Sequence, residues 1–214
     1  MNKKQKKKIE LKKNISIIIN MVLIILGIIG FIETIRMLGK YDITYYTLDS
    51  NLLAIFVEIL YLYFLVIKEK IPRWLQLLKY IATLSLVITF VVVVLVLAPL
   101  ENNNYRYFLL YGSQLYYHTL CPIIAFISFL FLENYKYEKK DILYALSFTI
   151  IYAIISILLN CIGVMNGPYP FLKVRINPWY ISILWFIVIL GLSYLLSYFL
   201  YYSKNLINKN TKYK

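Results

Sequence analysis

The stretch LQLLKYIATLSLVITFVVVVLVLAP, residues 75–99, is apolar at almost every position. As a helix, a segment of this length crosses the roughly 30 Å hydrocarbon core of a bilayer. The rest of the chain has the same character, because 61% of its 214 residues are hydrophobic, only 15% are charged, and the mean hydropathy is +0.70. This is far more apolar surface than a soluble domain of the same size can bury. We therefore predict an integral membrane protein.

The chain contains six such apolar runs, joined by short connections. No Gly/Ser-rich or Pro-rich linker and no internal repeat divides them, so we predict an all-α polytopic membrane protein with a single bundle of six transmembrane helices. The first run is longer than the apolar core of a secretory signal, and no small-x-small cleavage site follows it, so we expect it to be retained. The predicted spans are 15–38, 48–67, 75–99, 108–132, 142–165 and 179–202.

The net charge of +13 comes mostly from lysines in four short segments that flank the spans, at 1–14, 68–73, 136–140 and 203–214. The loops between the other span ends carry fewer positive residues, so the positive-inside rule places both termini in the cytoplasm. Residues 1–14 and 203–214 are then basic cytoplasmic segments on either side of a membrane domain at 15–202. This distribution predicts a multi-pass protein of the cell membrane that contacts lipids and binds no nucleic acid. It leaves the oligomeric state open.

Cysteine and histidine are scarce and scattered. Cys121 and Cys161 both fall inside predicted spans, and His118 is the single histidine. There is no CxxC pair and no Cys/His cluster of the kind that holds zinc. We therefore expect no metal, no cofactor and no disulfide framework, with the two cysteines as small buried apolar residues.

The second run contains a carboxylate at membrane depth, Glu58, where a charge costs about 2.5 to 3.5 kcal/mol on insertion scales. At 100° per residue, Thr47, Asn51 and Glu58 fall on one narrow stripe of a helix, which we expect to face the bundle or water. Structural explanations stand beside this one. An ion pair or an interhelical hydrogen bond accounts for Glu58, and Thr47 taken alone is most simply a helix N-cap.

The fourth run carries His118, with Gln114, Cys121 and Pro122 on the same helical face. Pro122 has no N–H to bond the carbonyl of His118, so we predict a kink. A neutral imidazole that bonds a tyrosine hydroxyl or a backbone carbonyl is the structural alternative for His118. Asn160 near the end of the fifth run is a third polar side chain for an interhelical network, and packing is the simpler explanation for it.

Three short segments, in this order and at these positions relative to the six spans, resemble the androgen-induced family of membrane threonine hydrolases. That family cleaves fatty acid esters of hydroxy fatty acids. The segments are Tyr45-Tyr-Thr47-Leu-Asp-Ser-Asn51-Leu-Leu, Tyr117-His118-Thr-Leu-Cys-Pro122 and Gly167-Pro-Tyr169-Pro-Phe-Leu172. The Ser-Asn pair after the threonine differs from the animal members. It is similar to the pattern of the uncharacterised bacterial branch, whose substrates are not known.

The resemblance implies that Thr47 is the nucleophile and that His118 is its partner. It marks the loop Tyr169-Pro170-Phe171 as a shared signature without an assigned chemical role. The chemistry is physically reasonable, because an imidazole within about 3 Å of a threonine hydroxyl can take its proton and pass it to a leaving alcohol. Among the residues of this chain, only His118 suits that role.

We accordingly predict an integral membrane hydrolase of lipid (fatty acyl) esters. In this hypothesis Glu58 orients the imidazole, and Asn51, Gln114 or Asn160 donates a hydrogen bond to the developing oxyanion. The alternative is a transporter or small-molecule binding protein in which Glu58 and His118 carry protons or hold a ligand. A third hypothesis, a sensor or assembly subunit with a purely structural polar cluster, predicts no cavity between the second and fourth spans.

Overall fold

A computed structural model describes residues 3–39, 42, 44–67, 69–133 and 135–212. Parts of the predicted basic segments and of the first loop therefore lie outside the described residues, namely 1–2, 40–41, 43, 68 and 213–214. Every regular element in the described part of the chain is helical, which confirms the predicted all-α class.

The helices are joined by short loops and in places by π-helical turns. The long ones are α1 (Lys3–Leu38), α2 (Tyr46–Val66), α3 (Arg73–Val92) and α9 (Trp179–Lys212). The shorter ones are η1 (Val93–Leu97), α4 (Ala98–Leu100), α5 (Tyr105–Leu110), η2 (Leu115–Leu120), α6 (Cys121–Ile127), η3 (Ser128–Leu132), α7 (Asp141–Ala145), α8 (Ser147–Cys161) and η4 (Pro170–Leu172).

Within the described residues, five helices are long and apolar enough to cross a membrane. They cover Ile9–Leu38, Tyr46–Val66, Arg73–Leu100, Leu115–Leu132 and Trp179–Lys209. The fifth predicted run, 142–165, forms α7 and α8 with Leu146 between them, and it ends early. Gly163 has φ +80°, and the N–H groups of Gly163 and Val164 donate to the carbonyls of Asn160 and Leu159. This pattern is a Schellman motif, and it stops the helix at Cys161, whose side chain is exposed rather than buried as expected.

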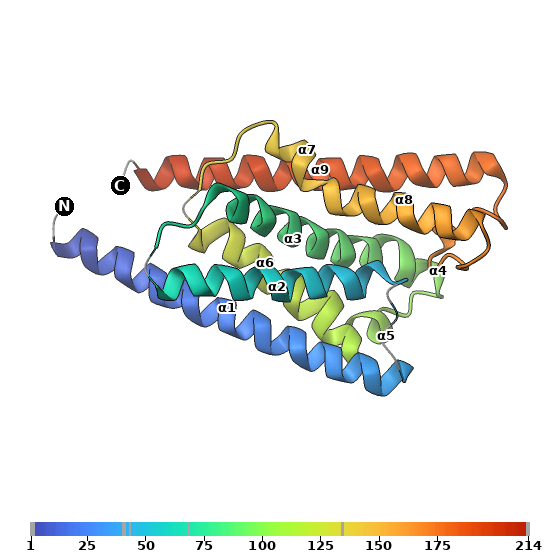
Figure 1. Cartoon of the computed structure of the whole chain (residues 1–214), viewed down its shortest axis with the longest axis horizontal. Helices are drawn as coiled ribbons and strands as arrows, with labels where there is room; N and C mark the ends of the chain where they lie inside the picture. The colour runs from blue at the N-terminus through green and yellow to red at the C-terminus, as the bar shows by residue number, and fades with distance from the viewer. Residues whose placement is uncertain (1–2, 40–41, 43, 68, 134, 213–214) are drawn as a thin grey trace.

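Successive segments run in alternating directions along one bundle, so the start of α1 and the end of α9 lie at the same end (Figure 1). α3 lies in the middle and is mostly buried, whereas α1 and α9 lie on the outside. Two hydrophobic clusters pack on either side of α3. One joins it to α8 and α9 through Leu84 and Ile88, and the other joins it to α1, α2 and α6 through Leu75 and Leu86.

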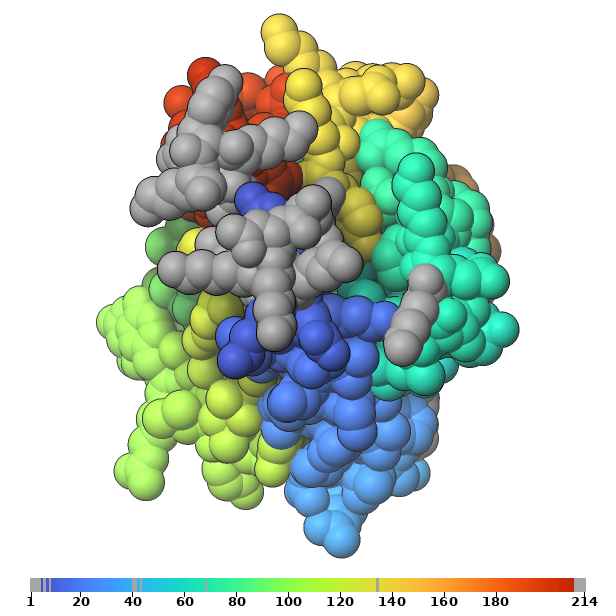
Figure 2. Space-filling model, turned by 90° about the vertical axis from the view of Figure 1, so that its left-hand side faces the viewer, coloured from blue at the N-terminus to red at the C-terminus, as the bar shows by residue number. Residues whose placement is uncertain are grey.

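The end of the bundle that holds the termini also holds the connections after α2 and before α7, coloured teal and yellow in Figure 2. These connections carry the positive residues Lys70, Lys136, Lys139 and Lys140. The helices continue into the basic terminal segments, since α1 begins at Lys3 and α9 ends at Lys212. Lys204, which the sequence places in the solvated tail, is instead buried. Its ammonium group donates to the carbonyls of Leu130 and Glu133 at the end of η3, where a cation is favoured.

Candidate functional site

Thr47 is the second residue of α2, and the start of α2 lies at the end of the bundle opposite the start of α1 and the end of α9 (Figure 1). The prediction of an N-cap role for Thr47 is wrong, because the N-cap position belongs to Tyr45, which makes no side-chain cap. Tyrosine hydroxyls from distant segments cap the helix instead. The N–H of Tyr46 donates to Tyr152 Oη at 3.1 Å, and the N–H of Thr47 donates to Tyr169 Oη at 3.3 Å. Unpaired helix N–H groups are thereby satisfied without an Asp, Ser or Asn cap.

His118 lies in η2, is 5% exposed, and faces Thr47. Its Nε2 atom is 3.3 Å from Thr47 Oγ1, and its Nδ1 atom is 2.7 Å from the carbonyl oxygen of Phe108. A carbonyl can only accept, so Nδ1 of a neutral imidazole carries the proton and Nε2 has a free lone pair. The Thr47 hydroxyl then donates to Nε2. This is the arrangement in which an imidazole can accept a hydroxyl proton.

The Phe108 carbonyl is available because α5 ends two residues later. The last carbonyls of a helix have no partner within it. Tyr111 is extended and Gly112 has φ +52°, so the chain reverses between α5 and η2. The reversal brings the Phe108 carbonyl to His118 Nδ1, and the Leu109 carbonyl accepts from Thr119 Oγ1 at 2.7 Å. The predicted span at 108–132 is therefore interrupted, and the interruption positions the histidine.

His118 lies in a π-helical turn, where the proline-induced distortion is absorbed. The N–H of Cys121 donates to the Tyr116 carbonyl, five residues back, and Pro122 has no N–H to donate to His118. π-Turns inside helices frequently occur at functional sites, where they re-aim a side chain. The sequence predicts a kink here; the structure shows a π-helical turn at His118, just before Pro122, and the kink itself stays a prediction.

Tyr169 supplies a third polar group. Its hydroxyl lies 3.4 Å from Thr47 Oγ1, and its ring stacks on Phe171 with the centroids 5.1 Å apart. Burial raises the pKa of Tyr169 to about 12, so its hydroxyl remains protonated at neutral pH and can donate. The loop 168–171 therefore gains a chemical feature that the sequence did not assign, namely a hydroxyl donor held beside Thr47.

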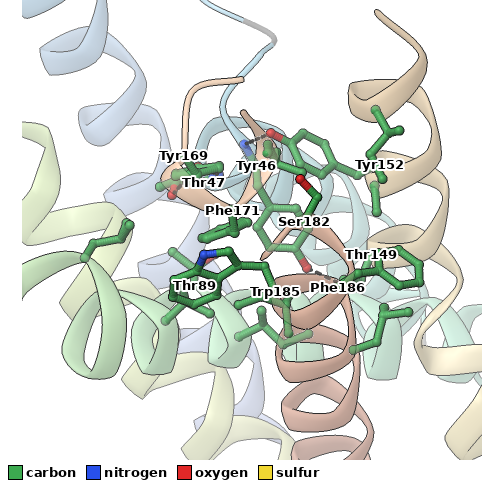
Figure 3. A pocket seen from close by; sticks show the side chains of 18 of the residues that line it. Tyr46, Thr47, Thr89, Thr149, Tyr152, Tyr169, Phe171, Ser182, Trp185 and Phe186 are labelled. Carbon is green, nitrogen blue, oxygen red and sulfur yellow. Dashed lines mark hydrogen bonds between the residues drawn. The ribbon is translucent and has the colours of Figure 1, made fainter. Parts of the chain in front are cut away.

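Two cavities meet at Thr47 and Tyr169. The larger has a volume of about 280 Å³, is lined by His118, Gln114, Glu101 and Pro170, and lies between the starts of α2 and η2. The smaller has a volume of about 70 Å³ and an apolar wall drawn from α3, α8 and α9. Figure 3 shows Thr47 and Tyr169 together at one edge of the smaller cavity, beside Phe171 and Trp185. The hypothesis of a purely structural cluster predicted no cavity here, and it is wrong on that point.

The predicted supporting residues are spread over different places. Gln114 lines the larger cavity. Asn51 is buried one turn below Thr47, and its Nδ2 donates to the carbonyls of Thr47 at 2.8 Å and Tyr117 at 3.3 Å. Asn160 accepts a hydrogen bond from the N–H of Arg175 at 3.3 Å, and so anchors the outer loop. Of these three, Gln114 and Asn51 lie at the site.

Glu58 lies 11 residues beyond Thr47 on α2, about 16 Å along the helix axis. Its carboxylate forms a buried ion pair with Lys79 of α3, and Lys79 also donates to Asn20 Oδ1 at 3.0 Å. Glu133 Oε1 is 3.8 Å from the same ammonium group. The hydrogen bond that orients His118 thus comes from the Phe108 carbonyl, and Glu58 belongs to a separate cluster of buried charges.

The sequence prediction missed two groups that matter here, the Phe108 carbonyl and Lys79, and it named Tyr169 without assigning a role to its hydroxyl. No sequence signal identifies the carbonyl, because its availability depends on where α5 ends. Lys79 did have a signal, since it is a cation inside the run 75–99 and Glu58 is an anion inside the neighbouring run. Opposite charges in adjacent membrane segments favour a buried pair.

Comparisons of the chain with protein-family models, with curated proteins and with solved structures find no match.

Proposed function

We propose that this protein is a membrane hydrolase of lipid (fatty acyl) esters that uses Thr47 as its nucleophile and His118 as its general base. The single observation that carries the proposal is the 3.3 Å contact between Thr47 Oγ1 and His118 Nε2, with Nδ1 held by the Phe108 carbonyl. A nucleophile, a base within hydrogen-bond reach, and a third group that orients the base are the parts that covalent acyl transfer requires.

In the first step, His118 Nε2 takes the Thr47 hydroxyl proton while Oγ1 attacks the ester carbonyl carbon. The carbonyl π electrons move onto the carbonyl oxygen, giving a tetrahedral oxyanion. As this species collapses, the bond to the leaving oxygen breaks, and that oxygen takes the proton from Nε2. The products are an alcohol and an acyl ester on Thr47.

Two features of the site favour the oxyanion. The hydroxyl of Tyr169 lies beside Oγ1 as a protonated donor. Thr47 also lies in the first turn of α2, where the helix dipole places partial positive charge. A positioned donor of this kind contributes a factor of about 10² to 10³ to the rate of acyl transfer.

The second step removes the acyl group. A water molecule in the place of the departed alcohol gives a proton to His118 Nε2 and attacks the acyl-threonine carbonyl. The bond to Thr47 Oγ1 then breaks, and Oγ1 regains the proton from Nε2, releasing a fatty acid. Neither step requires a metal or a cofactor.

The resemblance to the androgen-induced family of threonine hydrolases supports the same assignment, because it places a nucleophile at Thr47 and a partner at His118. Membrane lipids supply the surroundings, and a lipid ester is the proposed substrate. Transport through Glu58 and His118 has less support, since the cavity at His118 does not include Glu58 among its lining residues and the cavity at Glu58 has a volume of only about 10 Å³.

We further propose six spans, both termini in the cytoplasm and residence in the cell membrane. α7, Leu146 and α8 together cover 141–161, which is about 30 Å of helical rise and enough to cross once. The positively charged connections lie at the same end of the bundle as the start of α1 and the end of α9, in agreement with the positive-inside rule. Thr47 and His118 then lie near the outer face.

The proposal is tested by labelling membranes that contain the protein with a fluorophosphonate probe for serine and threonine hydrolases. We expect the wild type to react and both Thr47→Ala and His118→Ala to lose the label. Glu58→Gln serves as the matched control, because it changes a buried polar residue of the same helix outside the site. The folded fraction of this variant should react with the probe like the wild type. Labelling that persists in Thr47→Ala would reject Thr47 as the nucleophile.

A further inference from the structure

We infer that the acyl chain of the substrate occupies the smaller, apolar cavity among α3, α8 and α9, while the leaving alcohol occupies the larger cavity at His118. This inference rests on the proposed function and deepens it, because it assigns each half of the ester to its own side of Thr47. The larger cavity is about 280 Å³ and the smaller about 70 Å³ in the structure.

The position of His118 decides which half goes where. Its Nε2 atom must give a proton to the leaving oxygen, so the leaving group has to lie on the imidazole side of Thr47. His118 lines the larger cavity and is not part of the wall of the smaller one. The other substituent of the carbonyl carbon, which is the acyl chain, must therefore point to the opposite side. On that side lies the smaller cavity, which shares Thr47 and Tyr169 with the larger.

The walls of the two cavities suit the same division. The larger contains Glu101, Ser113 and Gln114 beside His118, so polar groups of an alcohol or a water molecule find partners there. The smaller also has hydroxyl-bearing residues in its wall, and the rest of that wall is formed by side chains such as Val92, Ile157, Phe171 and Trp185. An alkyl chain gains roughly 25 cal/mol per Å² of apolar surface removed from water, and this wall offers it such surface.

The smaller cavity is bounded by two helices, α8 and α9, whose outer sides would face lipid. α8 and α9 contribute Ala153, Ile157, Trp185 and Phe186 to its wall, and the outer sides of both helices are apolar and exposed. The hydroxyl of Ser182, on the same wall, is buried without a hydrogen-bond partner in the described part of the chain. We therefore place the entry of the acyl chain between α8 and α9.

Photoaffinity labelling tests the inference without depending on catalysis. Purified protein in nanodiscs is irradiated with palmitic acid that carries a terminal diazirine, and the crosslinked residues are mapped by mass spectrometry. We expect crosslinks in the α8 and α9 residues of the smaller cavity. Ala153→Trp, which fills the cavity, should lower this labelling at least fivefold. Ile155→Trp is the matched control, because Ile155 is exposed on the same helix and lies outside the wall.

Two outcomes would overturn the inference: crosslinks confined to the walls of the larger cavity, or labelling of Ala153→Trp equal to that of the wild type. If Ala153→Trp does not fold, Ile157→Phe on the same wall replaces it, with the melting temperature as the check. Thr47→Ala separates the two proposals, since it removes the nucleophile but keeps the wall that α3, α8 and α9 contribute, and it should still be crosslinked at the α8 and α9 residues. Crosslinks in the smaller cavity together with undiminished ester hydrolysis by Thr47→Ala would reject the nucleophile alone. If hydrolysis requires Thr47 but the crosslinking yield is the same in Ala153→Trp as in the wild type, only the proposed acyl-chain site is rejected.

Discussion

Thr47 and His118 are 71 residues apart in the sequence, and their Oγ1 and Nε2 atoms lie 3.3 Å apart in the structure. The contact joins the first turn of α2 to a π-helical turn, and each side has its own support. Tyr169 holds the threonine, and the Phe108 carbonyl holds the imidazole. These supports come from the last turn of α5 and from the loop residue before η4, so the site depends on the segments that connect the spans as much as on the spans.

The hydroxyl of Thr47 should be the reactive group. Thr47→Ser keeps a hydroxyl in nearly the same place, so we expect it to retain fluorophosphonate labelling and ester hydrolysis within about tenfold of the wild type. Thr47→Val has the same shape without the hydroxyl and should lose both. Gel-based labelling and release of fatty acid from a long-chain ester provide the measurements. Equal reactivity of the two variants would contradict the assignment.

Tyr169→Phe should slow the reaction while leaving the fold in place. Removal of one donor to an oxyanion lowers the turnover number by about 10² to 10³. Tyr152→Phe is the control, because it also removes a hydroxyl that caps α2, at Tyr46, away from the reacting atoms. We expect Tyr152→Phe to cost about 1 kcal/mol of stability and little activity. Equal turnover numbers for the two variants would remove Tyr169 from the mechanism.

Gly30→Ala should disturb the site from α1. A Cβ atom at Gly30 would lie 2.4 Å from Cε1 of Tyr117, so the residue before His118 has to move. We expect a loss of about 1 to 3 kcal/mol in stability, with hydrolysis reduced about 10-fold to 100-fold. Gly191→Ala on α9 is the control, since no atom lies within 4 Å of its Cβ position. The melting temperature and the hydrolysis rate should both fall in Gly30→Ala and stay near the wild-type values in Gly191→Ala.

Lys79→Met should destabilise the bundle strongly. The substitution leaves the carboxylate of Glu58 buried without its cation, and breaking a buried pair in this way costs about 3 to 5 kcal/mol. The double variant Lys79→Met/Glu58→Leu removes both charges and should recover most of the loss. Thermal unfolding in detergent measures the difference. A double variant no more stable than Lys79→Met would show that the ion pair is not the source of the effect.

Glu133 should make stability depend on pH. Burial raises its pKa from 4.5 to about 7, and both of its carboxylate oxygens lack hydrogen-bond partners in the described part of the chain. The unfolded chain loses this proton near pH 4.5, whereas the folded protein keeps it until about pH 7. The stabilisation is therefore complete below pH 4.5 and is lost as the pH rises through 7, a change of about 3 kcal/mol.

Glu133→Gln removes that titration. We expect the variant to be more stable than the wild type at pH 8 and to approach it at pH 5, as measured by melting temperature in detergent. Titrating groups far from Glu133 affect both proteins equally, so the difference between the two melting-temperature curves reports Glu133 together with the charged groups that face it, such as Lys79. A difference that stays constant from pH 5 to pH 8 would contradict the prediction.

The sequence by itself determined the class of the protein and the approximate position of its helices. Apolar runs such as 75–99 have only one stable form in lipid, because every backbone N–H and C=O must be paired within the segment. Because polar side chains are rare in membrane spans, Thr47, Asn51 and His118 could be identified as candidates from the sequence. A residue that is expensive at membrane depth has to face the bundle, so it stands out without any structure.

Only the tertiary structure decided how these residues combine. The reversal at Gly112 separates α5 from the rest of the predicted span 108–132, and it thereby directs a helix-end carbonyl at His118. Glu58 forms its ion pair with Lys79 in a separate cluster, and Tyr169, 122 residues away in the sequence, accepts a hydrogen bond from the N–H of Thr47. The physical reason is that hydrogen bonds and ion pairs depend on positions within a few tenths of an ångström. Those positions follow from how helices end and pack, which hydrophobic patterning along a chain does not specify.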